Sequence, residues 1–231
     1  MAQKISLEVI KKEKVTEKVF FITFRLVSPP TISFKAGQNM MLMVAPGVNR
    51  TMSIASPPSA NEILMVHDVS PMGPGSKWTE RLAVGDTATI VAPTGGALSF
   101  VDSSKKKVMI ATGTGIAPFR GMIIDRLSRD EHAPLVLYWG QRYETDIYWK
   151  EEFDLIASQH PSFSWKLILS KPTDAWQGLK GHVTEYVLQN EHDMQTSEFY
   201  LCGNKGMIEE VRTKLQEQGV PQAQIKTELF Y

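Results

Sequence analysis

The stretch VMIATGTGIAPFRGMI, residues 108–123, decides the fold of the second half of the chain. An uninterrupted apolar run ends in Gly113-Thr114-Gly115 and passes directly into residues with helical periodicity. Glycines permit a tight turn, and Pro118 fits a first helical turn, where its missing N–H costs little. The stretch therefore predicts a buried strand, a glycine turn and a helix, the opening unit of a parallel α/β sheet.

The same turn suits a phosphate group. Glycines let a pyrophosphate approach the backbone, while the free N–H groups and the dipole of a helix N-terminus attract the anion. The candidate residues are Thr112, Gly113, Thr114, Gly115 and Pro118. Pro118 stands where the usual dinucleotide fingerprint has glycine or alanine. Taken alone, the turn fits a structural strand-to-helix connection equally well.

The remainder of the second half continues the alternation of strands and helices. Helical periodicity is found in FRGMIIDRLSRD (119–130) and MIEEVRTKLQEQG (207–219). The apolar runs between them are KVMIAT (107–112), PLVLYWG (134–140), SWKLILS (164–170) and EFYLCG (198–203). This order predicts βαβ units in a doubly wound parallel sheet.

The first half has a strand-like pattern instead. Its runs are ISLEVIKKEKV (5–15), KVFFITFRLV (18–27), QNMMLMV (38–44), EILMVHDV (62–69) and DTATIVA (86–92). Strands this closely spaced predict an antiparallel sandwich or barrel. A length of 231 residues suits two domains. We place them at 1–102 and 103–231, with the linker near residues 101–106.

Composition excludes several classes of function. Lys plus Arg and Asp plus Glu both total 25, so no global field favours nucleic acid. Lys105, Lys106 and Lys107 are interpreted as a solvated linker. The N-terminus lacks an apolar signal core and no window suits a membrane span, so we expect a cytoplasmic protein.

Cysteine and histidine argue against metal centres. Cys202 is the single cysteine, so cysteines of this chain can form neither a disulfide nor an iron–sulfur cluster, and any such cluster must belong to a partner. The histidines show no metal-ligand spacing and are interpreted as surface or loop residues. They are His67, His132, His160, His182 and His192.

Several motifs together resemble the ferredoxin-NADP reductase superfamily. GTGIAP (113–118), YLCGNKGMIEEV (200–211) and TELFY (227–231) occur in the order found in that family. Upstream, RTMS (50–53) is similar to its Arg-x-Tyr/Phe-Ser/Thr flavin motif, and GPGSKWTERL (73–82) to its Gly-x-x-Ser/Thr flavin-phosphate motif. The resemblance spans residues 5–231, and ordered motifs are far more specific than any one of them.

The resemblance implies an antiparallel β-barrel that binds FAD, with FMN less expected, followed by an NAD(P)-binding α/β domain. It also implies hydride transfer from NADPH or NADH to the flavin. Electrons then pass to a ferredoxin, a flavodoxin, a subunit of a larger redox complex or a small acceptor, since this chain has no cluster of its own.

Arg50, Thr51, Met52 and Ser53 form the implied flavin strand. Arg50 would pair with the flavin pyrophosphate, a task suited to its planar charged fork. Ser53 would direct its hydroxyl toward the flavin ring. Met52 replaces the usual aromatic residue and gives up a flat stacking surface. Without the family context, Arg50 and Ser53 would be an ordinary surface arginine and a solvated serine.

Gly75 and Ser76 form the second implied flavin site. Ser76 is interpreted as the N-cap of a helix whose free terminus holds a second phosphate, a contact worth only about 0.3–1 kcal/mol. A plain helix cap is the alternative.

The implied reaction site is lined by Ser53, Cys202 and Glu228. Cys202 and Gly203 end a predicted parallel strand, and the cysteine would pack beside the nicotinamide. The alternative for Cys202 is a small buried core residue. Phe230 or Tyr231 would stack on the flavin and swing aside for the nicotinamide, although a last strand could instead place Phe230 in the core.

Selection of the dinucleotide is expected after the third strand of the second half. Arg142, Ser170 and Lys171 could receive a 2′-phosphate, and the sequence shows no clear acidic residue in their place. This favours NADPH, with NADH as the alternative. Two other functions fit parts of the pattern: a weakly active electron-transfer or regulatory subunit, which Met52 favours, and a nucleotide-binding interaction module without flavin.

Overall fold

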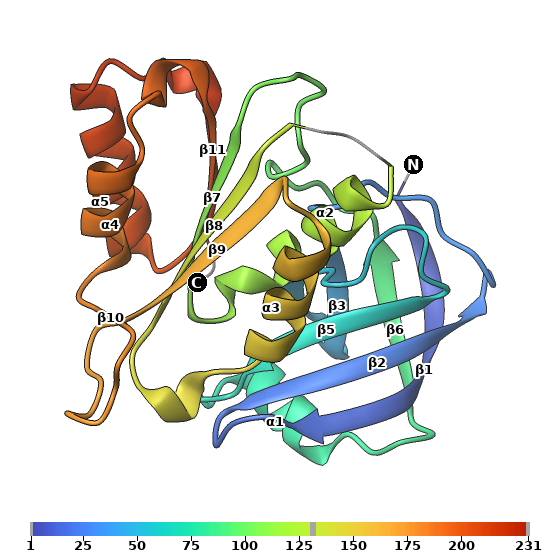
Figure 1. The fold of residues 1–231 in the computed structure, drawn as a ribbon. Helices are drawn as coiled ribbons and strands as arrows, with labels where there is room; N and C mark the ends of the chain where they lie inside the picture. The colour runs from blue at the N-terminus through green and yellow to red at the C-terminus, as the bar shows by residue number, and fades with distance from the viewer. Residues whose placement is uncertain (1, 130–132, 230–231) are drawn as a thin grey trace. The chain divides into compact units, whose positions relative to one another are not determined.

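The computed structural model describes residues 2–129 and 133–229. These residues form two compact units. One comprises the residues up to Ser99 together with Ala117–Arg126, and the other comprises Phe100–Ile116 and the residues from Leu127 onward. Each unit contains a six-stranded sheet (Figure 1). Among the described residues, no helix combines the length and apolar character needed to cross a bilayer.

The first unit is built on an antiparallel sheet with the strand order β4-β3-β6-β1-β2-β5. The end strands β4 and β5 contact each other, so the sheet curls into a half-barrel. Its elements are β1 (Gln3–Lys14), β2 (Val19–Ser28), β3 (Asn39–Ala45), β4 (Val48–Ser53), β5 (Glu62–Asp68), α1 (Pro74–Arg81), β6 (Thr87–Ala92) and α2 (Ala117–Leu127).

Alternation along the strands forms the core of this sheet. Ile5, Leu7 and Val9 of β1 are fully buried, whereas the residues between them are partly exposed. They pack with buried residues of the neighbouring strands, including Phe24 and Ile90. The period of two places one apolar face of the sheet inside, as the sequence predicts.

Strand β4 is absent from the runs identified by sequence pattern. Asn49, Arg50 and Thr51 are polar and exposed, so the strand has no alternating apolar residues. It forms because it pairs with β3 as an edge strand of the sheet. Tertiary pairing thus overrides a weak local signal.

The second unit is an all-parallel sheet with the strand order β10-β9-β8-β7-β11-β12. Its strands are β7 (Lys107–Thr112), β8 (Leu135–Gln141), β9 (Phe163–Leu169), β10 (Leu179–Lys180), β11 (Glu198–Gly203) and β12 (Ile225–Leu229). Its helices are η1 (Gly113–Ile116), η2 (Glu144–Asp146), α3 (Lys150–Gln159), α4 (Val183–Asn190), η3 (Met194–Thr196), α5 (Lys205–Glu217) and η4 (Gln222–Gln224).

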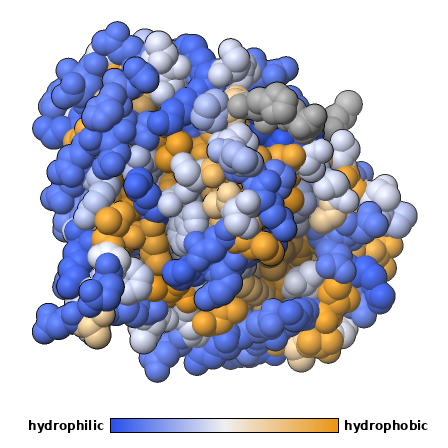
Figure 2. All heavy atoms as spheres, in the orientation of Figure 1, coloured by the Kyte–Doolittle hydropathy of each residue, from blue (hydrophilic) through white to orange (hydrophobic). Residues whose placement is uncertain are grey.

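Helices cover both faces of this sheet. In Figure 1, α4 and α5 lie on one side and α3 on the other. Covered central strands must be apolar on both faces, which explains the continuous apolar runs of β7 and β8. Helix α5 buries Met207, Val211 and Leu215, and Figure 2 shows hydrophilic residues over the outer surface where α4 and α5 lie. The predicted barrel and doubly wound sheet are both confirmed.

The strand order reverses between β7 and β11. The chain builds outward from β7 through β8 and β9 to β10, and then returns to place β11 on the other side of β7. In open parallel sheets, ligands bind in the crevice at the carboxyl ends of strands where the order reverses. The turn after β7 and the segment after β11 are therefore the expected ligand positions.

At the amino end of β7, Lys106 and Lys107 are not part of a solvated linker, contrary to the sequence interpretation. Lys107 is fully buried and its Nζ donates to Glu198 at 2.7 Å and to Ser103 at 2.7 Å. Lys106 pairs with the buried Glu191. Two buried carboxylates require cationic partners, and the lysines provide them. Lys105 is exposed, as expected.

We predict that the buried Lys107–Glu198 pair contributes far more to the free energy of unfolding than an exposed ion pair does. Glu198→Ala should lower the free energy of unfolding by about 3–5 kcal/mol, because it leaves a buried ammonium unpaired. Glu217→Ala is the matched control: it removes the exposed pair with Lys214 and should cost less than about 0.5 kcal/mol. Urea denaturation measures both values. Equal losses for the two variants would contradict the assignment of Lys107 as a buried charge.

Candidate functional site

In the first unit, three elements meet at the start of α1. A Cβ added at Gly75 would lie 3.3 Å from Cγ of Arg50 on β4 and 3.3 Å from Cε1 of His67 on β5. The first turn of α1 is therefore flanked by a guanidinium-bearing side chain and an imidazole. Helix N-termini leave their first N–H groups without intrahelical partners. This arrangement can hold an anion.

The expected N-cap is wrong by three residues. Helix α1 begins at Pro74 with Gly73 as its N-cap, and Ser76 lies inside the first turn, where it is buried. The cause is Pro74, whose fixed φ suits the first helical position and starts the helix earlier than Ser76 suggests. Gly75 and Ser76 nonetheless both lie in the turn that carries the free N–H groups.

His67 is a site residue that the sequence interpretation missed. It lies in β5, half-buried, and its Nδ1 lies 2.7 Å from Oγ1 of Thr79 on α1. Burial lowers the pKa of His67, and the nearby Arg50 lowers it further, against the opposing effect of Asp68. The imidazole is thus kept neutral at pH 7. A lone histidine in a strand-like run gave no signal of this contact.

Ser53 and Met52 occupy different environments. Ser53 ends β4, is buried, and pairs in register with Asn39 of β3, so it is not a solvated serine. Met52 is half-buried and packs against the apolar core of the half-barrel. Thr51, between Arg50 and Met52, is exposed. The strand therefore presents Arg50 outward and Ser53 at its buried end.

In the second unit, the ends of β7 and β11 meet backbone to backbone. A Cβ on Gly115 would fall under 3.0 Å from the carbonyl oxygen of Cys202, and one on Gly203 would meet Thr112 equally closely. Thr112 also accepts a hydrogen bond through Oγ1 from the Asn204 N–H at 2.9 Å. The glycine turn and the Cys-Gly segment are thus joined at the point where the strand order reverses.

The turn itself leaves room on its outer side. Gly113 has φ 55°, which is strained for other residues, and a Cβ there would meet nothing within 4 Å. Pro118 is buried in the first turn of α2, as the sequence predicts. A short 3-10 segment, η1, lies between the strand and that helix. The sequence pattern predicted a direct passage from turn to helix.

Cys202 is fully buried and stands opposite Glu228 in the pairing of β11 with β12. Burial raises the pKa of the Cys202 thiol, and the Glu228 carboxylate adds to the effect. A neutral thiol is a packing group rather than a nucleophile. Glu228 is half-buried at the end of the sheet. Phe230 and Tyr231 lie outside the described residues.

The residues expected near the nucleotide 2′ position lie at one corner of the sheet. Backbone bonds continue past β8 and β9, since the Lys171 N–H donates to the Arg142 carbonyl at 2.9 Å. Ser170 is half-buried beside them. An acid was missed here: Glu144 accepts from the Thr173 backbone N–H at 2.8 Å and from its hydroxyl at 2.6 Å. The corner thus carries both signs of charge.

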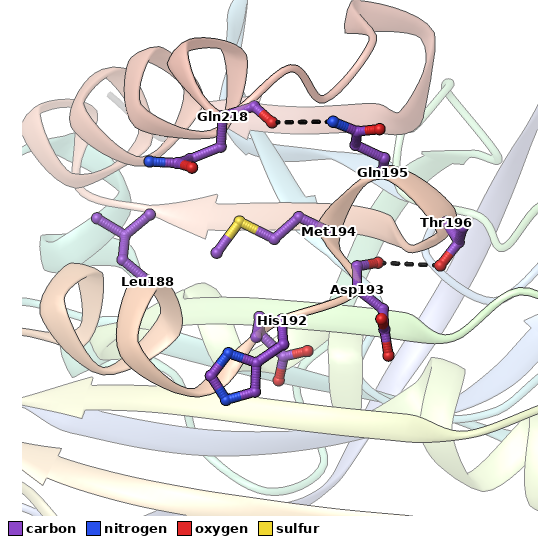
Figure 3. A pocket seen from close by; sticks show the side chains of 8 residues that line it. Leu188, His192, Asp193, Met194, Gln195, Thr196 and Gln218 are labelled. Atoms are coloured by element: carbon purple, nitrogen blue, oxygen red, sulfur yellow. Dashed lines mark hydrogen bonds between the residues drawn. The ribbon is translucent and has the colours of Figure 1, made fainter.

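A hollow of about 530 Å³ lies elsewhere in the second unit (Figure 3). Leu188, Met194 and Gln218 are among its lining residues, which come from the ends of α4 and α5 and from η3. Segment η3 leads into the amino end of β11, whereas ligands of parallel sheets bind at carboxyl ends. The strand-end cluster is therefore the better candidate.

Residues 109–213 match the family described as "Oxidoreductase NAD-binding domain". The chain is 34% identical over 184 residues to the anthranilate 1,2-dioxygenase electron transfer component of Acinetobacter baylyi, covering 78% of this chain and 53% of that protein. It is 32% identical to a subunit of the Na(+)-translocating NADH-quinone reductase of Pseudomonas paraeruginosa, covering 77% and 43%. The chain thus spans about half the length of these relatives.

Solved structures show the same fold. An Amycolatopsis cytochrome P450 reductase superposes with a TM-score of 0.91 at 24% identity, over 99% of this chain and 70% of that one. A ferredoxin NADP+ reductase from Neisseria gonorrhoeae superposes with a TM-score of 0.84 at 20% identity, over 100% of both chains. The chain therefore has the fold of a ferredoxin NADP+ reductase, and residues 109–213 match an oxidoreductase NAD-binding domain. The resemblance drawn from its motifs is confirmed.

The backbone contact at Gly115 predicts that Gly113 and Gly115 differ in how well they tolerate substitution by alanine. Gly115→Ala should destabilise the protein by more than about 2 kcal/mol, because the new methyl overlaps a carbonyl that cannot move alone. Gly113→Ala places its methyl in open space and should cost about 1–2 kcal/mol through its positive φ. Chemical denaturation separates the two. A Gly115→Ala protein as stable as Gly113→Ala would refute the contact.

The lowered pKa of His67 predicts a dependence of stability on pH. Between the folded-state pKa and about 6.5, the unfolded chain binds a proton that the folded chain resists, so stability falls as pH drops through that window, by at most about 1.4 kcal/mol per pH unit. His67→Gln should reduce this loss below about pH 6.5, because glutamine takes up no proton in either state. Unfolding curves measured on both sides of that pH test the effect, and identical slopes for the wild type and the variant would contradict it.

Proposed function

We propose that this chain is a flavin-dependent oxidoreductase that accepts hydride from NAD(P)H on bound FAD and passes the electrons to a separate acceptor. The observation that carries the proposal is the pair of anion-binding arrangements. One unit gathers Arg50, Gly75 and His67 at the start of α1, and the other joins Gly115 to Cys202 where the strand order reverses. We assign the flavin to residues 1–102 and the dinucleotide to residues 103–231.

The residues of the first unit fit FAD. Arg50 is exposed and offers a planar fork to the pyrophosphate. Gly75 and Ser76 provide backbone N–H groups at the start of α1, and the absence of a side chain at Gly75 lets Arg50 and His67 approach this turn closely. Thr51 and Met52 complete the strand. The diphosphate of FAD matches two cationic or N–H-rich groups better than the single phosphate of FMN does.

The residues of the second unit fit a nicotinamide dinucleotide. Thr112, Gly113 and Thr114 form a turn with open space at Gly113, so a pyrophosphate can approach the backbone. Gly115 and Pro118 link this turn to α2. Glycines at such turns serve close approach of phosphate. The same segment contacts Cys202 and Gly203, which brings the proposed nicotinamide position next to the proposed phosphate position.

The flavin supplies the hydride-accepting ring when it is bound. Ser53 would direct its buried hydroxyl toward the flavin ring, and the neutral thiol of Cys202 would pack beside the nicotinamide without competing as a nucleophile. Glu228 holds a carboxylate beside Cys202. Catalysis then comes from orientation rather than acid–base chemistry.

Selection between NADPH and NADH is assigned to the corner of Arg142, Ser170 and Lys171. The two cations favour a 2′-phosphate, as the sequence interpretation expected. Glu144 opposes it, since a carboxylate repels phosphate and can accept a ribose hydroxyl instead. The relative from Pseudomonas paraeruginosa is named for NADH, which also supports NADH rather than NADPH as the donor. Either dinucleotide is therefore tested as donor.

The acceptor is proposed to be another redox centre, such as a ferredoxin, a flavodoxin or a component of a larger complex. One relative is named as the electron transfer component of a dioxygenase and another as a subunit of a quinone reductase, so both work within multi-component systems. A weakly active electron-transfer or regulatory subunit is the second candidate. It is favoured by Met52, which packs against the core of its own unit and offers no flat ring.

The visible absorption spectrum of the purified protein tests the proposal. Flavin bands that bleach on anaerobic addition of NADPH or NADH are expected, and the faster donor identifies the preferred dinucleotide. Flavin bands that neither donor bleaches would identify the regulatory subunit. A protein that stays colourless after incubation with FAD would overturn the proposal in favour of a nucleotide-binding module without flavin.

Arg50→Ala sharpens this test. Loss of a charge-assisted contact with the pyrophosphate should weaken FAD binding roughly ten- to hundredfold, equivalent to about 1.5–3 kcal/mol. Arg25→Ala is the matched control, because Arg25 is an exposed β2 arginine paired with Glu8. Flavin fluorescence titration measures both affinities, and equal affinity in the two variants would remove Arg50 from the site.

A further inference from the structure

The carbonyl oxygen of Gly113 is held by two aromatic side chains of the second unit. Trp139 of β8 donates its indole N–H to this oxygen at 3.0 Å. Tyr148, which lies between η2 and α3, directs its hydroxyl to the same oxygen at 3.4 Å. The first distance is normal for an N–H donor, whereas the second is long for a hydroxyl. Trp139 therefore provides the main contact and Tyr148 a weaker one.

The rings that make these contacts are fixed in place. Trp139 is fully buried. The centroid of its ring lies 5.0 Å from the ring centroid of Tyr148 and 6.5 Å from that of Phe153, and both pairs are edge-on. Trp149 extends the cluster beyond Tyr148 at 5.3 Å. Edge-on aromatic packing of this kind is favourable. The indole N–H consequently has one available direction, toward the glycine turn.

Holding this carbonyl also sets the direction of the next amide. In a planar trans peptide the C=O and the following N–H point in opposite directions. Capture of the Gly113 oxygen therefore aims the N–H of Thr114 away from Trp139 and Tyr148. These side-chain contacts add to the restraint that the 3-10 segment η1 places on the same peptide, since Gly113 has no side chain to hold its φ of 55°.

We propose that Trp139, assisted by Tyr148, is a positioning residue that orients the Thr114 N–H for the pyrophosphate of the dinucleotide. This rests on the proposed function, which places the pyrophosphate at the glycine turn. The contribution is pre-organisation: the bond exists before the ligand arrives, so the ligand does not bear the entropy of ordering the turn. Trp139 itself touches no substrate.

Binding of ADP-ribose to Trp139→Phe tests the proposal. Phenylalanine keeps an aromatic ring in the cluster but has no N–H to donate. ADP-ribose contains the pyrophosphate and lacks the nicotinamide, so calorimetry reports on the turn independently of flavin and hydride transfer. We expect binding roughly five- to tenfold weaker, the equivalent of one hydrogen bond. The KM for the preferred dinucleotide should rise by a similar factor with kcat unchanged, a split that general destabilisation would not produce.

Three further variants serve as controls. Tyr148→Phe should weaken ADP-ribose binding only about twofold, since its contact is long. Trp165→Phe removes an indole N–H that bonds to Asp154, and Tyr186→Phe removes a hydroxyl that bonds to the Lys180 carbonyl. Neither reaches the turn, so both should bind ADP-ribose like the wild type.

The outcomes separate this inference from the proposed function. If the wild type does not bind ADP-ribose, the proposed function fails. If the wild type binds it and folded Trp139→Phe binds equally well, the positioning role is overturned. Should Trp139→Phe fail to fold, the indole N–H resonance of Trp139 in wild-type protein decides: a shift on saturation with ADP-ribose supports the role, and an unmoved resonance refutes it.

Discussion

The close approach of two backbone segments, at the ends of β7 and β11, is the constraint on which the second unit depends. Gly115 meets the carbonyl of Cys202 and Gly203 meets Thr112 at distances that no side-chain carbon could tolerate. The hydrogen bond from Asn204 to Thr112 closes the same junction. Residue 115 must be glycine because backbone atoms of Cys202 and Gly203 fill the space that a Cβ would occupy. Residue 113 is glycine for a different reason: its φ is positive, although a Cβ there would meet no other atom.

This distinction changes how a glycine-rich turn is understood. Sequence patterns treat the glycines of such a turn as one phosphate-binding feature. Here one glycine permits strand packing, one permits the backbone conformation, and the orientation of the peptide between them depends on aromatic residues from β8 and the segment before α3. Binding geometry is therefore supported by residues distant in sequence, which a local motif does not contain.

Much of the fold could be predicted from the sequence because the two periodicities differ so clearly. Period-two alternation marks β1, and continuous apolar runs mark β7 and β8. The polar edge strand β4 gave no such signal, and the start of α1 depended on Pro74 rather than on the serine two residues later. Local patterns report burial well and element boundaries poorly.

The sequence predicted the candidate site poorly wherever a polar or charged side chain bonds to a residue distant in the chain. Lys107 looked like part of a basic run, yet it is neutralised by Glu198, far along the chain. Glu144 and His67 gave no signal for the same reason, since their partners Thr173 and Thr79 lie in other parts of the chain. A single sequence shows which residues carry charge but not which residues face one another.

The buried charges at the amino end of β7 also define where this chain can be divided. Ser103 bonds to both Lys107 and Glu198, and the Val101 N–H bonds to the Tyr200 hydroxyl at 3.0 Å. The connecting segment is therefore hydrogen-bonded to the second unit rather than a flexible tether. A nucleotide-binding fragment that begins at β7 would expose an incomplete ionic cluster, whereas one that begins at Phe100 would retain it, so cloning boundaries should follow this packing and not the first residue of the strand.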